Sequence, residues 1–545
     1  MRPTVKLLLA TLLITSIAGL GSVAGCNREP ALPKRVLVFG IDGGTWDVIL
    51  DEFKAGQLPN LKRIYDSGVH GVLESRPPIL SPVVWSTIFT GRPWQEHGVK
   101  DWKTSQSQHR QVKPIWQIAS QLGLQSNVVN VPSTWPPEQI RGEMISGFPL
   151  SGSTIGGNTG EVVTHDGLSR PDLPPSYQYN TQRIQERLNG LAVGAWSDWF
   201  PVEVRGRPNW RAMMRVLRFE DDRYYLTPIY RTDDGVVITQ PIALHAELDK
   251  QIGQPYVPEG PGWSKHAEED TPKYLYDHLL QIAQVQTKGA ALLAAKKWDL
   301  FIYVDTLVDR ISHPYWSYMR PNDYVDVDPA KAARYGDVVR NAYRQADLQL
   351  GEVLKAAEAP YWVMIVSDHG FQSSQEKTMR IGTHAFDGIY IVSGPGLKSS
   401  DGARAYIEDV APTVLYLLDK PVGSDMKGKV IQQVADAVGR TIQTVPTYED
   451  GVHRGTNAPV DAKTWEQLRG LGYVDGAAPK KVPPPPPVKP KAPTGARPGP
   501  GQMGAAPKPA PGAAAPNATT QPPRAVQPDG AKPSPVPAPP PADMR

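Results

Sequence analysis

Three apolar runs in this sequence each stop abruptly at polar residues. The first run, Val36–Ile41, is followed by Asp42-Gly43-Gly44, and the second is Asp299–Val304. The third, Trp362–Ser367, leads into Asp368-His369-Gly370. Uninterrupted apolar runs of this length are typical of strands buried on both faces of a parallel sheet.

Helix-like patterns alternate with these runs, at Thr45–Lys54, Tyr274–Ala295 and Pro329–Ala357. Strands that alternate with helices indicate an α/β fold, with a mostly parallel central sheet flanked by helices on both faces. Ligands of such sheets bind beyond the carboxyl ends of the strands. The polar residues that follow the apolar runs are expected at that edge.

The composition changes between about Ser151 and Trp263, where glycine, proline and aromatic residues become frequent. Short alternating stretches at Tyr224–Tyr230 and Gly235–Thr239 indicate β-structure. We interpret this range as a β-rich insertion that covers or borders the site.

The first 25 residues have the pattern of a signal peptide. Arg2 and Lys6 precede an apolar stretch, Leu7–Leu20, that is short for a bilayer span. The stretch leads to Val23-Ala24-Gly25-Cys26, which resembles the lipobox of bacterial lipoproteins. The resemblance implies that Cys26 is lipidated, becomes the mature N-terminus and anchors the chain to the membrane of the cell envelope. The next residue is Asn27 rather than Asp, which in lipoproteins of Gram-negative bacteria indicates a location in the outer membrane. An ordinary cleaved signal beside a chance cysteine is the alternative.

Cysteine and charge exclude several classes of protein. Cys26 is the single cysteine of 545 residues, which excludes an intrachain disulfide or a multi-thiolate metal site. The segment 479–545 holds 23 of the 56 prolines and no aromatic residue, so we expect a disordered tail. The tail carries +7 and the leader +2 of an overall +3, which leaves the body, residues 26–478, at −6. This acidic body argues against a nucleic-acid-binding domain. The basic tail suits contact with anionic wall polymers, and a solvated spacer explains it equally well.

Acidic and imidazole side chains recur at the expected carboxyl edge. Asp309 and His313 are four residues apart, so both project from one face of a helix. Three carboxylates and three imidazoles form a mixed nitrogen and oxygen set that suits two zinc-type cations. The candidate ligands are Asp42, Asp309, His313, Asp368, His369 and His384.

Ser81 is the candidate nucleophile. Two adjacent cations can stabilise both the attacking and the leaving oxygen in phosphoryl transfer, and such a site needs an attacking group. Ser81 stands immediately before Pro82 and a helix-like segment, so its hydroxyl is expected at a helix N-terminus. A serine oxygen activated by a metal needs no general-base histidine.

Several segments together resemble the alkaline phosphatase superfamily, in its type I phosphodiesterase/nucleotide pyrophosphatase branch. The resemblance covers about Arg35–Gly476, with less certain matching across the insertion. Two further segments, DVAPTVLYLL and LRGLGYV, resemble closing elements of this superfamily. The five main segments, in order, are FGIDGGTWDVI, LSPVVWSTIFTGRPWQEHGV, DTLVDRISHPYW, VSDHGF and THAFDGIYIVSGPG.

This resemblance implies an alkaline-phosphatase-like α/β sandwich and a metal-dependent phosphohydrolase over residues 26–478. It implies that Ser81 is the nucleophile and that the cations are two Zn²⁺, with Mn²⁺ as the alternative. One cation would be held by Asp42, Ser81, Asp368 and His369. The other would be held by Asp309, His313 and His384.

Two departures from the family pattern narrow the expected activity. Nucleotide pyrophosphatases have an Asn that binds a phosphoryl oxygen, and Trp102 occupies the matching position here. Sulfatases have Pro two residues and Arg four residues after the reactive residue, whereas Pro82 and Trp85 occupy the first and fourth positions after Ser81. The lipobox uses the only cysteine, so a cysteine-derived formylglycine is excluded as well.

Simpler roles exist for each candidate alone. Asp42 could cap the following helix, and Asp309 with His313 could form a pair on a helix surface. His97 is interpreted as structural. Trp85 either lines the pocket or, as is usual for an aromatic side chain, packs in the core.

Three functions are compatible with the pattern. The first is hydrolysis of a phosphodiester or phosphomonoester through a phospho-Ser81 intermediate. The second is transfer of phosphoethanolamine or phosphoglycerol onto an envelope glycan. The third is an inactive lipoprotein that tethers the envelope through its tail.

Overall fold

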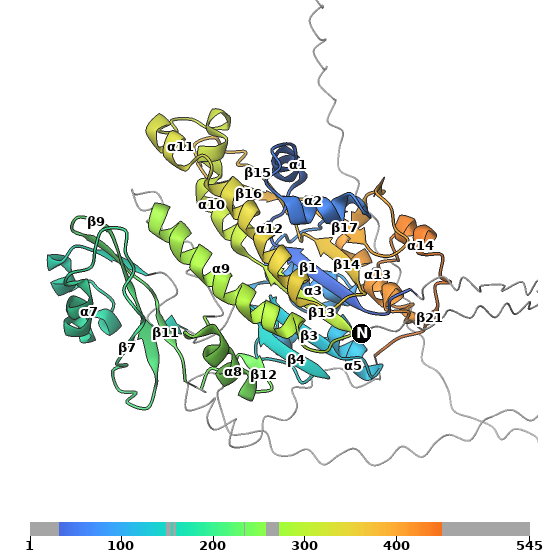
Figure 1. Cartoon of the computed structure of the whole chain (residues 1–545), viewed down its shortest axis with the longest axis horizontal. Helices are drawn as coiled ribbons and strands as arrows, with labels where there is room; N and C mark the ends of the chain where they lie inside the picture. The colour runs from blue at the N-terminus through green and yellow to red at the C-terminus, as the bar shows by residue number, and fades with distance from the viewer. Residues whose placement is uncertain (1–31, 149–153, 156–159, 234, 258–271, 450–545) are drawn as a thin grey trace, which may run out of the picture. The chain divides into compact units, whose positions relative to one another are not determined.

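The computed structural model describes residues 32–148, 154–155, 160–233, 235–257 and 272–449 (Figure 1). Four predictions fall outside these residues: the signal peptide 1–25, the lipidated Cys26, the closing segment LRGLGYV and the tail 479–545. Of the helices that the structure describes, none is both long enough and apolar enough to cross a membrane.

Ten of the described strands form one sheet, in which β4, β3, β13, β1 and β14 are consecutive parallel neighbours. Strands β12 and β17 run antiparallel to their neighbours. The predicted α/β fold with a mostly parallel sheet is therefore confirmed. In spatial order the strands are β12 (Thr239–Gln240), β4 (Gly142–Ser146), β3 (Ser126–Val131), β13 (Leu300–Asp305), β1 (Val36–Ile41), β14 (Trp362–Val366), β17 (Asp387–Ser393), β2 (Gly68–Glu74) and β18 (Ser400–Asp401), with β19 (Ala405–Tyr406) also paired to β2.

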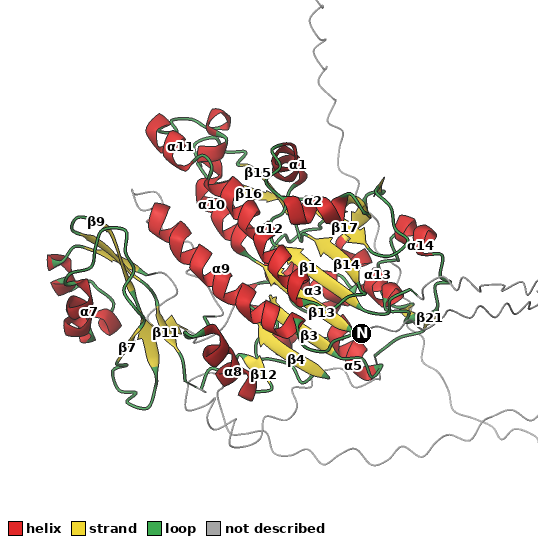
Figure 2. Ribbon diagram, viewed as in Figure 1, coloured by secondary structure: helices red, strands yellow, loops and turns green. Residues whose placement is uncertain are grey.

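Alternate residues of the central strands feed two hydrophobic cores, one on each face of the sheet. In β1, Leu37 and Phe39 belong to the first core, whereas Val36 and Val38 belong to the second. Figure 2 shows helices and strands together, with α9, α10 and α12 packed side by side over the first face. The first core takes helices α1 (Trp46–Lys54), α2 (Pro59–Tyr65), α8 (Ala243–Ile252), α9 (Pro272–Ala294), α10 (Leu307–Met319), α11 (Pro329–Tyr335) and α12 (Val338–Ala356). The second core takes α3 (Ser81–Thr90), α5 (Ile115–Gln121), α13 (Val410–Leu417) and α14 (Gln432–Val438).

The helical pattern predicted over Pro329–Ala357 is divided into two helices, α11 and α12. The chain turns at Gly336, where a Cβ atom would lie 2.7 Å from the carbonyl oxygen of Ala332. Five shorter elements lie outside the central sheet and the helices that cover it. Helix α4 (Trp94–His97) follows α3, strands β15 (Gly370–Ser373) and β16 (Gly382–Ala385) pair with each other, and β20 (Val422–Gly423) pairs with β21 (Thr444–Val445).

The range 151–263 contains a lobe with two small antiparallel sheets and a core of its own. Pro228 separates two strands within the stretch Tyr224–Tyr230. The end of the range instead joins the main body, because β12 pairs with β4 and α8 packs into the first core. The elements of the lobe are β5 (Thr154–Ile155), β6 (Glu161–Val163), α6 (Pro175–Tyr179), α7 (Thr181–Leu188), β7 (Phe200–Val202), β8 (Ala212–Met214), β9 (Val216–Glu220), β10 (Arg223–Leu226) and β11 (Ile229–Arg231).

Candidate functional site

Two carboxylates lie at the carboxyl ends of adjacent strands. Asp42 directly follows β1, Asp368 lies just beyond β14, and both are fully buried. Gly43 turns the chain with φ of +78°, a conformation that L side chains rarely adopt, and its N–H donates to Asp368 Oδ1 at 3.2 Å. Thr45 is the N-cap of α1 and Asp42 makes no capping bond. The turn after β1 therefore keeps the carboxylates of Asp42 and Asp368 close together.

Ser81 faces Asp42 from the first turn of α3. It is the first residue of the helix and Pro82 is the second, a position at which a missing N–H costs nothing. Its Oγ atom lies 3.5 Å from Asp42 Oδ1, and the side chain is buried. Hydroxyl and carboxylate therefore share the helix N-terminus, where the macrodipole favours negative charge.

Asp309 and His313 project from one face of α10, one turn apart. Asp309 Oδ1 lies 3.4 Å from His313 Nε2 and 3.2 Å from Nε2 of His384, which lies on β16. The two imidazole Nε2 atoms are 3.1 Å apart. Helix α10 and the β15–β16 pair thus bring three side chains from distant parts of the sequence together.

All three candidate histidines present the same nitrogen to the centre. Nδ1 of His313 donates to the carbonyl oxygen of Gly382 at 3.0 Å, and Nδ1 of His384 donates to that of Ile79 at 3.0 Å. Nδ1 of His369 donates to the Gly370 carbonyl oxygen, also at 3.0 Å. A carbonyl oxygen can only accept, so Nδ1 carries the proton in each ring. In the neutral form of each ring, the Nε2 lone pair is therefore the one available to a metal ion.

His369 lies between the two halves of the site. Its Nε2 atom is 3.4 Å from Asp42 Oδ1, 3.4 Å from Asp368 Oδ2 and 3.8 Å from Asp309 Oδ1. Among the described residues, two sets of three side chains could each hold a metal ion, and His369 belongs to both sets. Within each set, the ligand atoms lie within 4.8 Å of one another. The sets are Asp42, Asp368 and His369, and Asp309, His369 and His384.

The site holds buried ligand atoms with no hydrogen-bond partner. Asp309 Oδ1, Asp368 Oδ2 and His369 Nε2 are all of this kind, although buried polar atoms are normally paired. Burial, and then the negative charges of Asp42 and Asp309, raise the pKa of Asp368 well above its usual value. Divalent cations would satisfy these atoms and offset the repulsion among the carboxylates, so the residues fit a metal centre.

The seven side chains predicted to form the site are brought together by the structure. One contact was not predicted, that of Trp85 with Asp42, because the sequence left Trp85 either as a pocket-lining or as a core residue. Its indole N–H donates to Asp42 Oδ2 at 3.1 Å. The signal was present, because Trp85 follows Ser81 by four residues and so lies on the same helical face. The residues brought together are Asp42, Ser81, Asp309, His313, Asp368, His369 and His384.

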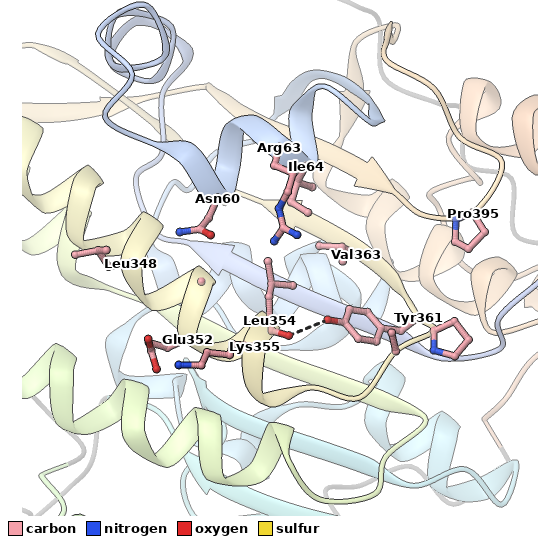
Figure 3. A pocket seen from close by; sticks show the side chains of 13 residues that line it. Asn60, Arg63, Ile64, Leu348, Glu352, Leu354, Lys355, Tyr361, Val363 and Pro395 are labelled. Carbon is pink, nitrogen blue, oxygen red and sulfur yellow. Dashed lines mark hydrogen bonds between the residues drawn. The ribbon is translucent and has the colours of Figure 1, made fainter.

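A cleft of about 750 Å³ lies at the other end of β14 (Figure 3). It is bordered by α2, the last turns of α12 and the residues just before β14, and Arg63 and Lys355 contribute positive charge to its lining. The hydroxyl of Tyr361 donates to the carbonyl oxygen of Leu354 at 3.3 Å there. The candidate ligands are absent from its lining, so it is separate from the candidate metal centre.

Comparison with known proteins identifies the family. Residues 36–411 match the model of the family described as type I phosphodiesterase/nucleotide pyrophosphatase. Among curated proteins, none is similar enough in sequence to match the chain.

Three solved structures are similar at low identity. Human ectonucleotide pyrophosphatase/phosphodiesterase 5 is 10% identical, with 74% of this chain and 99% of that chain covered and a TM-score of 0.35. The phosphonate monoester hydrolase of Silicibacter pomeroyi is 14% identical, with coverage of 76% and 78% and a TM-score of 0.34. A 2-O GAG sulfatase, BT1596, is 11% identical, with coverage of 76% of each chain and a TM-score of 0.39.

The family match covers every side chain of the site described above. The chain therefore belongs to the type I phosphodiesterase/nucleotide pyrophosphatase family and is a phosphoric ester hydrolase.

Proposed function

We propose that the chain hydrolyses a phosphodiester or phosphomonoester at a two-metal site, with Ser81 as nucleophile. The observation that carries the proposal is the convergence of three imidazole Nε2 atoms and three carboxylates beside one buried hydroxyl. Nitrogen and oxygen ligands in this proportion suit Zn²⁺, and Mn²⁺ is the alternative.

The ligands divide between two cations. Asp42, Ser81, Asp368 and His369 would hold one, and Asp309, His313 and His384 would hold the other. When bound, such cations supply Lewis-acid stabilisation of the phosphoryl oxygens. His369, which lies close to both groups, would sit at the boundary between them.

Ser81 carries the covalent chemistry. Its Oγ atom attacks phosphorus, the Oγ–P bond forms, and the bond to the leaving alcohol breaks, so that the alcohol departs with a proton. Water then attacks phospho-Ser81, phosphate or a phosphomonoester leaves, and the serine hydroxyl is restored. The first turn of α3 places Oγ where the helix dipole favours the negative charge that develops on it.

Ser81→Ala tests the nucleophile without removing an acidic or imidazole ligand. We expect turnover of an aryl phosphodiester to fall by roughly a thousandfold or more, while the metal content stays close to that of the wild type. Ser86→Ala is the matched control, because Ser86 is buried on the same helix and its hydroxyl only donates to the Pro82 carbonyl oxygen. Wild-type turnover in Ser81→Ala would refute the role of Ser81.

Metal analysis tests the centre itself. We expect about two equivalents of zinc per chain in the wild type, and fewer in His384→Ala, because that change removes an Nε2 ligand. A wild-type protein that binds no divalent cation would overturn the proposal.

A further inference from the structure

The indole of Trp85 lies in the second core, next to Asp42 of the proposed metal centre. Trp85 is fully buried, and its N–H donates to Asp42 Oδ2 at 3.1 Å. Trp85 and Ser81 are four residues apart on α3, so one helical face presents a hydroxyl and an indole to the same carboxylate.

The two oxygens of Asp42 have different surroundings. Oδ2 accepts the indole N–H, whereas Oδ1 lies 3.5 Å from Ser81 Oγ and 3.4 Å from His369 Nε2. Oδ1 therefore faces the nucleophile and the ligand atoms, and Oδ2 faces the core. The side-chain torsion χ2 of an aspartate has a broad distribution of values. A hydrogen bond from the indole N–H to Oδ2 therefore restricts the carboxylate to orientations in which Oδ1 faces Ser81 and His369.

A glycine in strand β1 leaves room for the indole of Trp85 beside Asp42. Gly40 lies two residues before Asp42, and a Cβ atom there would lie 2.5 Å from Cη2 of Trp85. The indole also stacks on Phe89, with ring centroids 5.7 Å apart. The ring is thus held between β1 and its own helix, and its N–H is fixed toward Asp42.

We propose that Trp85 is a positioning residue that makes Asp42 a single-oxygen ligand, with Oδ1 directed to the cation beside Ser81. The inference rests on the proposed function, because it assigns the orientation of a ligand in that metal centre. Hydrogen bonds to ligating groups tune metal affinity by fixing the orientation of the ligand. A Phe at this position would keep an aromatic ring in the core and remove only the donor and part of its volume.

Trp85→Phe and Trp362→Phe form a matched pair for the test. Trp362 is also fully buried in the second core, but its indole N–H donates to the Pro33 carbonyl oxygen at 2.9 Å, at the amino end of β14. The measurement is the Zn²⁺ affinity of metal-free protein, by competition with a chromophoric chelator. We expect Trp85→Phe to weaken the affinity about 10- to 100-fold and Trp362→Phe to leave it unchanged.

Kinetics provide the second readout. With saturating zinc, Trp85→Phe should lower kcat more than it raises KM for an aryl phosphodiester, because the misplaced carboxylate lies beside the nucleophile. Trp362→Phe should retain both constants and change only the urea midpoint. Gly40→Ala, whose Cβ would displace the indole, should weaken zinc affinity in the same direction, and it decides the question if Trp85→Phe does not fold.

Failure of this inference can be distinguished from failure of the proposed function. If Trp85→Phe or Gly40→Ala folds and binds zinc as tightly as the wild type, Trp85 is a packing residue only, and the two-metal site still stands. If the wild type binds no zinc, both fall together.

Discussion

His97 is a single side chain held in one protonation state by its surroundings. It is fully buried, its Nδ1 atom accepts the Val99 N–H at 3.1 Å, and Nε2 lies 3.0 Å from the Thr87 hydroxyl oxygen. Because Nδ1 accepts, the proton of the neutral ring is on Nε2, which donates to Thr87. Burial, and then the positive charge of Arg110, lower the pKa of His97 to about 3.

This shift predicts acid destabilisation. The unfolded chain binds a proton at His97 below about pH 6.5, whereas the folded chain does so only near pH 3. The free energy of unfolding should therefore fall as the pH drops from about 6.5 toward 3, by up to about 1.4 kcal/mol per pH unit from this group.

Urea unfolding of the wild type and His97→Gln between pH 7 and pH 4 measures this effect. As the pH falls, the free energy of unfolding of the wild type should decrease more than that of His97→Gln. A difference that does not change with pH would contradict the assigned protonation state.

At the scale of elements, helix α12 secures the turn that carries Asp42. The Tyr343 hydroxyl donates to the Gly43 carbonyl oxygen at 3.1 Å and accepts the Thr45 N–H at 3.1 Å. Further along α1, the buried Glu52 accepts from Arg340 at 3.1 Å and from Arg344 at 2.7 Å. Helix α12 therefore holds both the turn and α1, the helix that follows the turn.

Glu52→Gln should lower the free energy of unfolding by about 1–3 kcal/mol, because it removes a buried charge that is paired with two guanidinium groups. Both arginines are about a quarter exposed, which keeps the effect below that of a fully buried pair. The matched control is Asp51→Asn on the same helix, where Asp51 is 42% exposed, pairs with Lys54 at 3.3 Å and lies at the longer distance of 3.8 Å from Arg340. It should change stability by less than about 0.5 kcal/mol. Equal urea midpoints for the two variants would argue against a stabilising role of the ion pairs between Glu52 and α12.

At the scale of the whole molecule, we propose that lipidation of Cys26 anchors the enzyme to the cell envelope, in the outer membrane. Expressed in a Gram-negative bacterium, the full chain should sediment with membranes, and Cys26→Ser should release it to the soluble fraction with its turnover intact. Deletion of residues 480–545 serves as the control, because the anchor precedes the body. Release of the deletion variant and retention of Cys26→Ser would instead assign attachment to the tail.

Much of the fold follows from local patterns. The predicted strands at Val36–Ile41 and Trp362–Ser367 form β1 and β14, because an apolar run of that length is stable only when both faces are buried. The stretch Ile389–Val392 lies in β17, but apolar periodicity does not encode direction, and this strand runs antiparallel. The break at Gly336 was missed for a similar reason, since one glycine is also tolerated inside a helix.

The sequence alone predicted the set of candidate ligand residues, because parallel strands end at one edge and helical spacing puts Asp309 and His313 on one face. Only the tertiary structure decided which atoms face the centre. Hydrogen bonds from Nδ1 to carbonyl oxygens such as those of Ile79 and Gly382 leave Nε2 of His384 and His313 facing the centre. The indole of Trp85, for which Gly40 leaves room, bonds Oδ2 of Asp42 and leaves Oδ1 facing the centre. These contacts join segments far apart along the chain, so they exist only once the core has packed.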